Sequence, residues 1–357
     1  MWLPRPEHPA ARPASSSPAV PHRKRALITG FTGMVGSHLA DHLLANTDWE
    51  ITGLLRWNDD LSNVEHLLPR INDGDRIGLC YGDLNDHPSL QKAIAAARPD
   101  YVFHLAAQSY PKTSFDAPLE TLQTNILGTA SLLEAIRTDG CRPIVHVCAS
   151  SEVFGRVPRE LLPIHEDRPF HPASPYAISK VGTDLVGRFY AEAYGLCVMT
   201  TRMFTHTGPR RGDVFAESTF AKQIALIEEG RIAPILRTGN LDSLRTWADV
   251  RDAVRAYHLL VTVEPTAGAY YNIGGTFTCT VGDMLRHLLS LSSRDDIEVV
   301  TDPERLRPID ADLQVPDCSK FTAHTGWRPE LTFEQTMQDL LDHWRERVRA
   351  GRQYLVR

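Results

Sequence analysis

A chain of 357 residues is longer than one hydrophobic core usually supports, so we expect one large domain and a smaller one. Hydrophobic residues make up 42% of the chain and charged residues 23%, which is typical of a water-soluble globular protein. The net charge of −6 gives no reason to expect nucleic acid or a membrane surface as a partner. The cysteines are scattered without zinc-site spacing, so no metal centre is predicted.

The first 24 residues are rich in Pro, Ala and Ser and lack the apolar stretch of a secretory signal. No run elsewhere reaches the length of a membrane span. We therefore expect residues 1–24 to be a disordered tail and the protein to be cytoplasmic.

From Arg25 onward, short apolar runs alternate with stretches of helical periodicity. The predicted strands are residues 25–30, 50–56, 76–84, 101–107, 143–150 and 196–204. The predicted helices between them include residues 34–46, 87–98, 118–138 and 175–194. Strands that are apolar throughout and alternate with helices form parallel sheets covered on both faces. The pattern therefore predicts an α/β fold, a doubly wound (Rossmann) parallel sheet.

After residue 205 this alternation ends. Residues 208–215 and 237–247 are predicted loops, and helices are predicted at 216–230, 248–262, 280–291 and 332–349. We expect residues 25–205 plus 246–275 to form the dinucleotide-binding domain. Residues 206–245 plus 276–357 are expected to form a smaller mixed α/β cap that binds substrate over the carboxyl edge of the sheet.

Three glycines directly follow the first strand and open the first helix. Gly30 permits a sharp turn, Gly33 lets a pyrophosphate approach the backbone, and Gly36 allows close packing of helix and strand. The amino terminus of the helix then faces the phosphate charge. The residues predicted to bind a dinucleotide are Gly30, Thr32, Gly33, Met34, Val35, Gly36, Arg56, Asp83, Leu84, Leu105, Ala106, Ala107, Tyr176 and Lys180.

The end of the second strand, Leu55-Arg56-Trp57, bears on the choice of cofactor. A residue that binds the ribose of NAD is expected to be acidic at this point. An arginine can instead pair with a 2′-phosphate. NADP is therefore favoured, with NAD as the alternative.

The fifth strand ends in "CASSEVFG", and "SPYAISK" follows some way on, with Tyr176 four positions before Lys180. Such a pair is ordinary on a helix surface, so its meaning depends on its surroundings. Beside a nicotinamide it has a clear use, because the ammonium lowers the pKa of the phenol, which can then take a hydroxyl proton as hydride leaves. A serine hydroxyl on the same substrate oxygen fixes the geometry.

Together these motifs resemble the extended short-chain dehydrogenase/reductases that act on nucleotide sugars, over residues 25–350. The resemblance rests on the glycine triplet, "HLAAQS", the serine before the tyrosine, the Tyr–Lys spacing and the "GP" after the sixth strand. Within that group the chain is most similar to the GDP-mannose 4,6-dehydratases, through "AAQSYPKTSFDAP", "SSEVFG", "HTGPRRG", "GNLDSLRTW" and "LRP".

The resemblance implies a redox loop with Ser150, Glu152, Tyr176 and Lys180 as catalytic residues. Tyr176 removes the proton from the sugar 4-hydroxyl while hydride passes to NADP, and Glu152 abstracts the 5-hydrogen. Water leaves from carbon 6, where the hydride returns. The resemblance also implies a nucleotide-sugar substrate, GDP-mannose or a close GDP-sugar, and a homodimer or homotetramer. The substrate-binding residues that it suggests are Ser109, Thr205, Arg210, Arg211, Arg245 and Arg307.

Several residues depart from the dehydratase pattern. Thr205 stands where asparagine is usual, Arg56-Trp57 replaces an Arg-Arg pair, and Asn125 and Asp310 are more like the reductases. A reductase or 4-epimerase on the same scaffold therefore stays an alternative, and so does a non-catalytic dinucleotide-binding regulator. The intact proton-transfer set argues against the regulator, because a sensor has no need of it.

Overall fold

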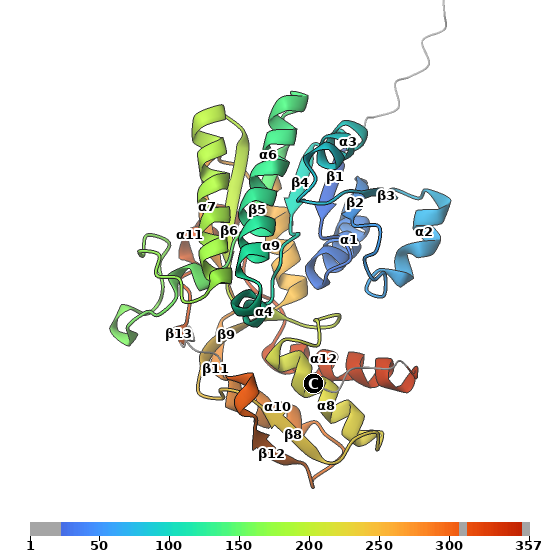
Figure 1. The fold of residues 1–357 in the computed structure, drawn as a ribbon, viewed down its shortest axis with the longest axis vertical. Helices are drawn as coiled ribbons and strands as arrows, with labels where there is room; N and C mark the ends of the chain where they lie inside the picture. Colours follow the sequence, from blue (N-terminus) through green and yellow to red (C-terminus); the bar gives the residue numbers. More distant parts are fainter. Residues whose placement is uncertain (1–22, 307–312, 352–357) are drawn as a thin grey trace, which may run out of the picture.

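The computed structural model describes residues 23–306 and 313–351. Its main strands are β1 (Arg25–Thr29), β2 (Glu50–Leu55), β3 (Ile77–Tyr81), β4 (Tyr101–His104), β5 (Ile144–Cys148), β6 (Cys197–Met203) and β10 (Tyr270–Ile273). Within the described ranges they form one sheet of seven strands, all parallel, in the order β10-β6-β5-β4-β1-β2-β3. The order runs outward from β1 in both directions (Figure 1), which confirms the predicted doubly wound fold.

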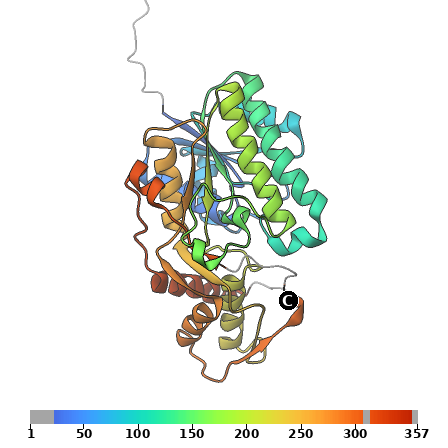
Figure 2. The ribbon, with the colours of Figure 1, turned by 90° about the vertical axis from the view of Figure 1, so that its left-hand side faces the viewer.

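Helices cover both faces of this sheet. One face carries α1 (Met34–Asn46), α9 (Val250–Thr262) and α11 (Ser319–Thr325), and the other carries α3 (His87–Ala97), α6 (Gly128–Asp139) and α7 (Pro175–Tyr194). Figure 2 shows α9 on one side of the strands and α6 and α7 on the opposite side. Ala26 and Ile28 pack into the first of these cores and Leu27 into the second. Because both faces are buried, the three central residues of β1, Ala26, Leu27 and Ile28, are all apolar.

The helix predicted at 118–138 contains a wider turn. It consists of α5 (Pro118–Leu122), a π-helical turn η2 (Gln123–Leu127) and then α6. Asn125 in this turn donates from Nδ2 to the hydroxyl of Ser179 at 2.8 Å and to the carbonyl of Gln108 at 2.9 Å. Its own carbonyl accepts the hydroxyls of Thr129 and Thr183. A π turn frees backbone groups for such contacts, and helical periodicity alone does not reveal it.

Most of the elements after β6, apart from α9, β10 and α11, form a second group, which lies below the main sheet in Figure 1. Its strands are β7 (His206–Thr207), β8 (Ile235–Thr238), β9 (Leu244–Asp249), β11 (Phe277–Thr280), β12 (Glu298–Thr301) and β13 (Leu313–Gln314). Strand β9 pairs with β7, β11 and β13, and β8 pairs with β12. The helices α8 (Ala216–Glu228), α10 (Val281–Ser290) and α12 (Phe333–Arg349) enclose a core that includes Trp247 and Met284.

The predicted loop at 237–247 is wrong, because it contains the end of β8 and most of β9. Arg245 and Trp247 alternate with Thr246 and Ala248 in a strand period, but a polar turn at 239–243 obscures this pattern. Strand β10 was also not predicted, nor were the short elements η1 (Glu65–Leu67), α2 (Leu68–Asp73), α4 (Pro111–Asp116), η3 (Ser151–Phe154), η4 (Arg159–Leu161) and η5 (Pro303–Arg305).

Some expectations fall on parts of the chain that the structure does not describe. The expected tail lies outside the described residues except for Arg23 and Lys24, and Arg307 and Asp310 lie outside them as well. Among the described helices, none has both the length and the apolar character needed to cross a bilayer.

Candidate functional site

The loop between β1 and α1 is shaped by its glycines. Gly30 has a left-handed φ of +68°, and a Cβ there would lie 2.8 Å from the backbone nitrogen of Ala106. A Cβ on Gly36 would lie 2.3 Å from the carbonyl oxygen of Gly30. Gly33 is the N-cap of α1 and makes no side-chain capping bond. The turn is therefore closely packed from behind, and the first N–H groups of α1 remain available to an anion.

The segment after β4 is hydrogen-bonded to the end of β1. The hydroxyl of Thr29 accepts hydrogen bonds from the backbone nitrogens of Leu105 and Ala106, both at 3.1 Å. On the other side, the carbonyl of Thr32 accepts a bond from Asn63 Nδ2 at 3.0 Å. The predicted cofactor residues Met34, Val35 and Ala107 lie in the same two segments. The ends of β1 and β4 thus form one continuous edge of a crevice.

The ends of β2 and β3 continue this edge. The Arg56 guanidinium lies 2.9 Å from the carboxylate of Asp59, and its side chain is 63% exposed. Trp57 beside it is 85% exposed. Asp83 accepts the backbone N–H of Asn85 at 2.8 Å, whereas Leu84 is buried. Arg56 can therefore reach a 2′-phosphate only by sharing its charge with Asp59.

The amino terminus of α7 sets the position of the Tyr–Lys pair. The hydroxyl of Ser174 accepts the N–H of Ala177 at 3.0 Å, and Pro175 occupies the first helical position. Both are favoured starts of a helix. Tyr176 consequently lies in the first turn and Lys180 one turn further along the same face.

Ser150, Tyr176 and Lys180 are brought together, and all three are buried. The Ser150 hydroxyl hydrogen-bonds the phenol of Tyr176 and also accepts the N–H of Glu152 at 3.2 Å. Lys180 Nζ donates to the carbonyl of Cys148 at 2.8 Å and lies 5.9 Å from the centre of the Tyr176 ring. The end of β5 thus holds the ammonium group, while the serine that follows it holds the phenol.

Burial has the largest effect on the pKa of both Tyr176 and Lys180. Burial raises the pKa of Tyr176 above its ordinary value, and the hydrogen bond from Ser150 opposes that rise. Burial likewise lowers the pKa of Lys180. Lys180 is bonded to the Cys148 carbonyl, and burial has the largest effect on the pKa of Tyr176, so the expected lowering of that pKa by the ammonium stays a prediction.

Glu152 and Arg245 meet although they are far apart in the sequence. Arg245 Nη1 lies 3.7 Å from Glu152 Oε1, and the two side chains are 12% and 17% exposed. The negative charge of Glu152 also raises the pKa of Tyr176, which places the carboxylate within electrostatic range of the phenol. The structure thus gathers a phenol, a carboxylate and a guanidinium around the end of β5.

The other residues predicted to bind substrate are placed differently. Arg210 Nη1 donates to Asp41 of α1 at 2.7 Å, and Arg211 Nε donates to Glu217 of α8 at 3.0 Å. Ser109 is exposed after β4, and Thr205 follows β6. Arg210 therefore lies against the cofactor half of the molecule, whereas Arg211 lies against the helix of the second group.

Three contacts around the site were not predicted from the sequence. They are the Cys148 carbonyl that accepts Lys180, the Asn125 side chain that bonds toward α7, and Asp41 beneath Arg210. Asn125 was visible in the sequence as a departure from the dehydratase pattern. The other two depend on strand and helix positions that no local motif reports.

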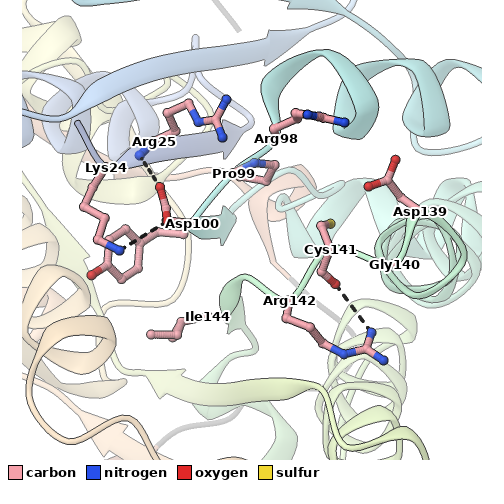
Figure 3. Close-up of a pocket in the computed structure, with 11 residues that line it drawn as sticks. Lys24, Arg25, Arg98, Pro99, Asp100, Asp139, Gly140, Cys141, Arg142 and Ile144 are labelled. Atoms are coloured by element: carbon pink, nitrogen blue, oxygen red, sulfur yellow. Dashed lines mark hydrogen bonds and ion pairs between the residues drawn. The ribbon is translucent and has the colours of Figure 1, made fainter. Parts of the chain in front are cut away.

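A cavity of about 530 Å³ lies at the opposite, amino edge of the sheet. Lys24, Arg25, Arg98 and Arg142 contribute to its lining, and Asp100 binds Lys24 at 3.3 Å. Figure 3 shows the guanidinium of Arg142 pointing away from those of Arg25 and Arg98. These cations do not converge on one point, so the cavity lacks the donor arrangement that a phosphate site needs.

Comparison with known proteins agrees with this geometry. Residues 27–340 match the family model described as GDP-mannose 4,6 dehydratase. A GDP-mannose 4,6 dehydratase of Arabidopsis thaliana is 35% identical, with 92% of this chain and 89% of that protein covered. The GDP-6-deoxy-D-mannose reductase of Pseudomonas aeruginosa is 32% identical, with 91% of this chain and 99% of that protein covered.

Solved structures give the same picture. The structure of RMD from Pseudomonas aeruginosa complexed with NADPH has a TM-score of 0.77 and 30% identity, and it covers 91% of this chain and 100% of that one. DesIV from Streptomyces venezuelae, a dTDP-glucose 4,6-dehydratase with NAD bound, has a TM-score of 0.76 and 27% identity, covering 90% and 97%. Sequence and fold agree over nearly the whole chain, which therefore belongs to the GDP-mannose 4,6-dehydratase family of the extended short-chain dehydrogenase/reductases.

Proposed function

We propose that this protein is a nucleotide-sugar 4,6-dehydratase that converts GDP-mannose to GDP-4-dehydro-6-deoxy-mannose. The observation that carries the proposal is Glu152, which lies beside the buried Tyr176 and Ser150. A dehydrogenase needs only the phenol and its partners, whereas elimination of water also needs a base for the 5-hydrogen. The dehydratase relatives support the same reaction.

The cofactor is NADP, with NAD as the alternative. The residues fit such a group, because a Cβ on Gly30 or Gly36 would collide with the turn, and no side chain caps α1. Gly33 and the first turn of α1 would hold the pyrophosphate, and Arg56 would lie at the 2′-phosphate. When bound, NADP would supply a hydride acceptor for carbon 4 and a hydride donor for carbon 6, with carbon 5 taking up a proton as the hydride arrives.

Tyr176 is the general base toward the sugar 4-hydroxyl. Its pKa is raised by burial, so loss of its proton depends on groups that stabilise the phenolate. The Ser150 hydroxyl donates to the phenol and orients the same sugar oxygen. Lys180 supplies positive charge from the next turn of α7.

Glu152 removes the proton from carbon 5 once carbon 4 is a ketone, because the ketone acidifies that position. The same carboxyl group can then give a proton to the departing 6-hydroxyl, so that water leaves. Arg245 stabilises the carboxylate electrostatically from 3.7 Å. A chain without this acid could oxidise and reduce at carbon 4 but not eliminate water.

The nucleotide sugar is bound between the two groups of elements. We propose that residues 25–205 plus 246–275 bind the dinucleotide and that residues 206–245 plus 276–357 form the substrate-binding cap. Arg211 and Arg245 suit the diphosphate because guanidinium groups bind phosphate oxygens in pairs. Ser109 and Thr205 stay proposed sugar contacts. Arg307 stays a proposed contact in a segment outside the described residues.

An exposed apolar face on α5, η2 and α7 supports a proposal about the quaternary state. Its residues are Leu119, Leu127, Ile178, Leu185, Phe189 and Tyr194, each at least 45% exposed. A patch of this kind usually marks a protein interface. We propose a homodimer or homotetramer built on this face. A cytoplasmic location stays part of the proposal.

A reductase is the second candidate, because the Pseudomonas aeruginosa reductase is covered over 99% of its length. Incubation with GDP-mannose and a trace of NADP separates the two readings. A dehydratase releases a product lighter by one water, seen by mass spectrometry, and consumes no reductant. A reductase leaves GDP-mannose unchanged and instead oxidises NADPH in the presence of the 4-keto-6-deoxy sugar.

The role of Glu152 is tested by Glu152→Gln. Hydride transfer to NADP should persist in a single turnover, seen as NADPH absorbance, while the dehydrated product is lost. Glu160→Gln is the matched control, because Glu160 is an exposed acid eight positions further along the chain. Dehydration by Glu152→Gln at the rate of the control would remove Glu152 from the mechanism.

A further inference from the structure

Gln314 is a buried polar residue whose hydrogen-bonding capacity is unused. It is 0% exposed, and neither its Nε2 nor its Oε1 has a hydrogen-bond partner within residues 23–306 and 313–351. Leaving a buried donor and acceptor unpaired is costly for a folded protein. An amide in this state is expected to bind a group that is not part of the described chain.

The position of Gln314 connects it with the candidate site. Strand β13 pairs with β9 so that Gln314 lies opposite Arg245. Side chains of directly paired residues lie on the same face of a sheet, so the amide stands beside the base of the Arg245 side chain. The guanidinium of that arginine in turn lies 3.7 Å from Glu152.

Arg245 is itself available to a ligand. Its contact with Glu152 is longer than a hydrogen bond, and among the described residues Arg245 has no closer polar partner. Arg210 and Arg211, by contrast, hold carboxylates at 2.7 and 3.0 Å. A carboxamide with unused capacity and an available guanidinium therefore belong to directly paired residues of β13 and β9, and the guanidinium lies 3.7 Å from the proposed base.

The two groups differ in what they can recognise. A guanidinium only donates hydrogen bonds, which suits the oxygens of a diphosphate. A carboxamide both donates and accepts, which suits a hydroxyl group. The 4-, 5- and 6-positions of the hexose are engaged by Tyr176 and Glu152 in the proposed reaction, so the 2- and 3-hydroxyls remain for recognition.

We propose that Gln314 is a specificity-determining residue that hydrogen-bonds the 2- or 3-hydroxyl of the substrate hexose, beside the Arg245 guanidinium. This assignment rests on the proposed nucleotide-sugar function and adds a contact that the family motifs do not supply. A hexose that lacks this hydroxyl would leave the donor and the acceptor of the amide unpaired, so the amide distinguishes such a sugar from the substrate.

The test uses Gln314→Met, which keeps the length of the side chain and removes both polar atoms. Calorimetric affinity for GDP-mannose should fall roughly tenfold, as expected for loss of a buried hydrogen bond, while affinity for NADP stays unchanged. The melting temperature without ligand should stay the same or rise, because a buried unpaired amide has been removed. An unchanged affinity for GDP-mannose would overturn the proposal and leave Gln314 as an amide satisfied by water.

Gln223→Met is the matched control. Gln223 is buried to a similar degree, but its Nε2 donates to the carbonyl of Arg237 and its Oε1 accepts the N–H of Arg237. This variant should lower the melting temperature and leave the affinity for GDP-mannose unchanged. If both variants lose affinity for GDP-mannose, the effect at Gln314 is one of general packing, and the proposal is overturned.

Substrate analogues identify the hydroxyl. GDP-2-deoxy-mannose and GDP-3-deoxy-mannose should each be titrated into the wild-type protein and into Gln314→Met. For one of them the variant should bind as tightly as the wild type, because the partner of the amide is already absent. A third titration uses GDP-mannose with a 2′-deoxyribose. If the variant and the wild type bind this analogue equally tightly, the contact lies on the ribose and the hexose assignment is overturned. If the dehydratase reaction itself is absent, no turnover is seen with wild-type protein, yet these binding titrations still decide the role of Gln314.

Discussion

Replacement of Ser150 by alanine probes the hydrogen bond that opposes the effect of burial on Tyr176. The phenol is buried and its pKa is raised by that burial, and the hydrogen bond from the Ser150 hydroxyl is the strongest influence that lowers it. A hydrogen bond to a charged group contributes about 1.5–3 kcal/mol, and this one is strongest when the phenol is ionised. Its loss should therefore raise the pKa of Tyr176 further.

The direction in which the pH profile shifts follows from the ionisation state in which Tyr176 acts. The active form of Tyr176 is the phenolate, so activity increases with pH as the phenol ionises. In Ser150→Ala this increase should move to higher pH, and kcat/KM at neutral pH should fall roughly 10–100-fold. Part of the loss should be recovered at alkaline pH. The assay is kcat/KM for dehydration of GDP-mannose across the pH range over which the enzyme stays folded.

Ser151→Ala is the matched control, because Ser151 is the adjacent serine and is also buried. It should leave the pH profile in place. A loss of activity in Ser150→Ala that is the same at every pH would refute the reasoning, since the serine would then orient substrate without influencing the ionisation of Tyr176. A shifted profile in the control would refute it equally.

Other perturbations test the rest of the architecture. Gly36→Ala should weaken NADP binding by calorimetry at least about 100-fold, because its Cβ would lie 2.3 Å from a carbonyl oxygen, whereas Gly78→Ala, in open space, should not. Arg56→Ala should weaken NADP binding roughly 10–100-fold and change NAD binding little, since only NADP carries the 2′-phosphate; equal losses would exclude that contact. Asp184→Asn should lower the free energy of unfolding in urea by about 3–5 kcal/mol, because it leaves the buried Arg202 without its ion-pair partner at 2.8 Å.

The main sheet could be predicted because its strands have a simple environment. Strands β1, β2, β4, β5 and β6 pack residues into the cores on both faces of the sheet, so an apolar run flanked by turn residues marks each of them. Strand β9 lacks this mark, because it carries Arg245, Thr246 and Asp249 among its apolar residues. Arg245 lies beside Glu152, Thr246 bonds to Thr278 of β11, and Asp249 caps α9. The polar side chains that make these contacts also hide the strand from recognition in the sequence.

In the candidate site, too, the placement of some residues could be predicted from the sequence and that of others could not. Tyr176 and Lys180 are fixed by one helix, and Ser150 and Glu152 by one turn, so spacing in the sequence predicts their mutual placement. The pairing of Glu152 with Arg245 depends on how β9 lies across the end of β5, which no local pattern determines. The effect of burial on the pKa of Tyr176 is likewise a property of the packed structure, which the spacing of Tyr176 and Lys180 does not reveal.

The two adjacent arginines of the "PRRG" loop show how geometry separates residues that look equivalent in sequence. Arg210 adopts a left-handed φ of +67°, a conformation unusual for a residue with a side chain, and the chain direction changes there. Arg210 therefore reaches Asp41 on α1, while Arg211 reaches Glu217 on α8. The loop is consequently tied to α1 through one arginine and to α8 through the other. Arg245 shares their chemistry, but among the described residues its guanidinium holds no carboxylate at hydrogen-bond distance, since Glu152 lies 3.7 Å away.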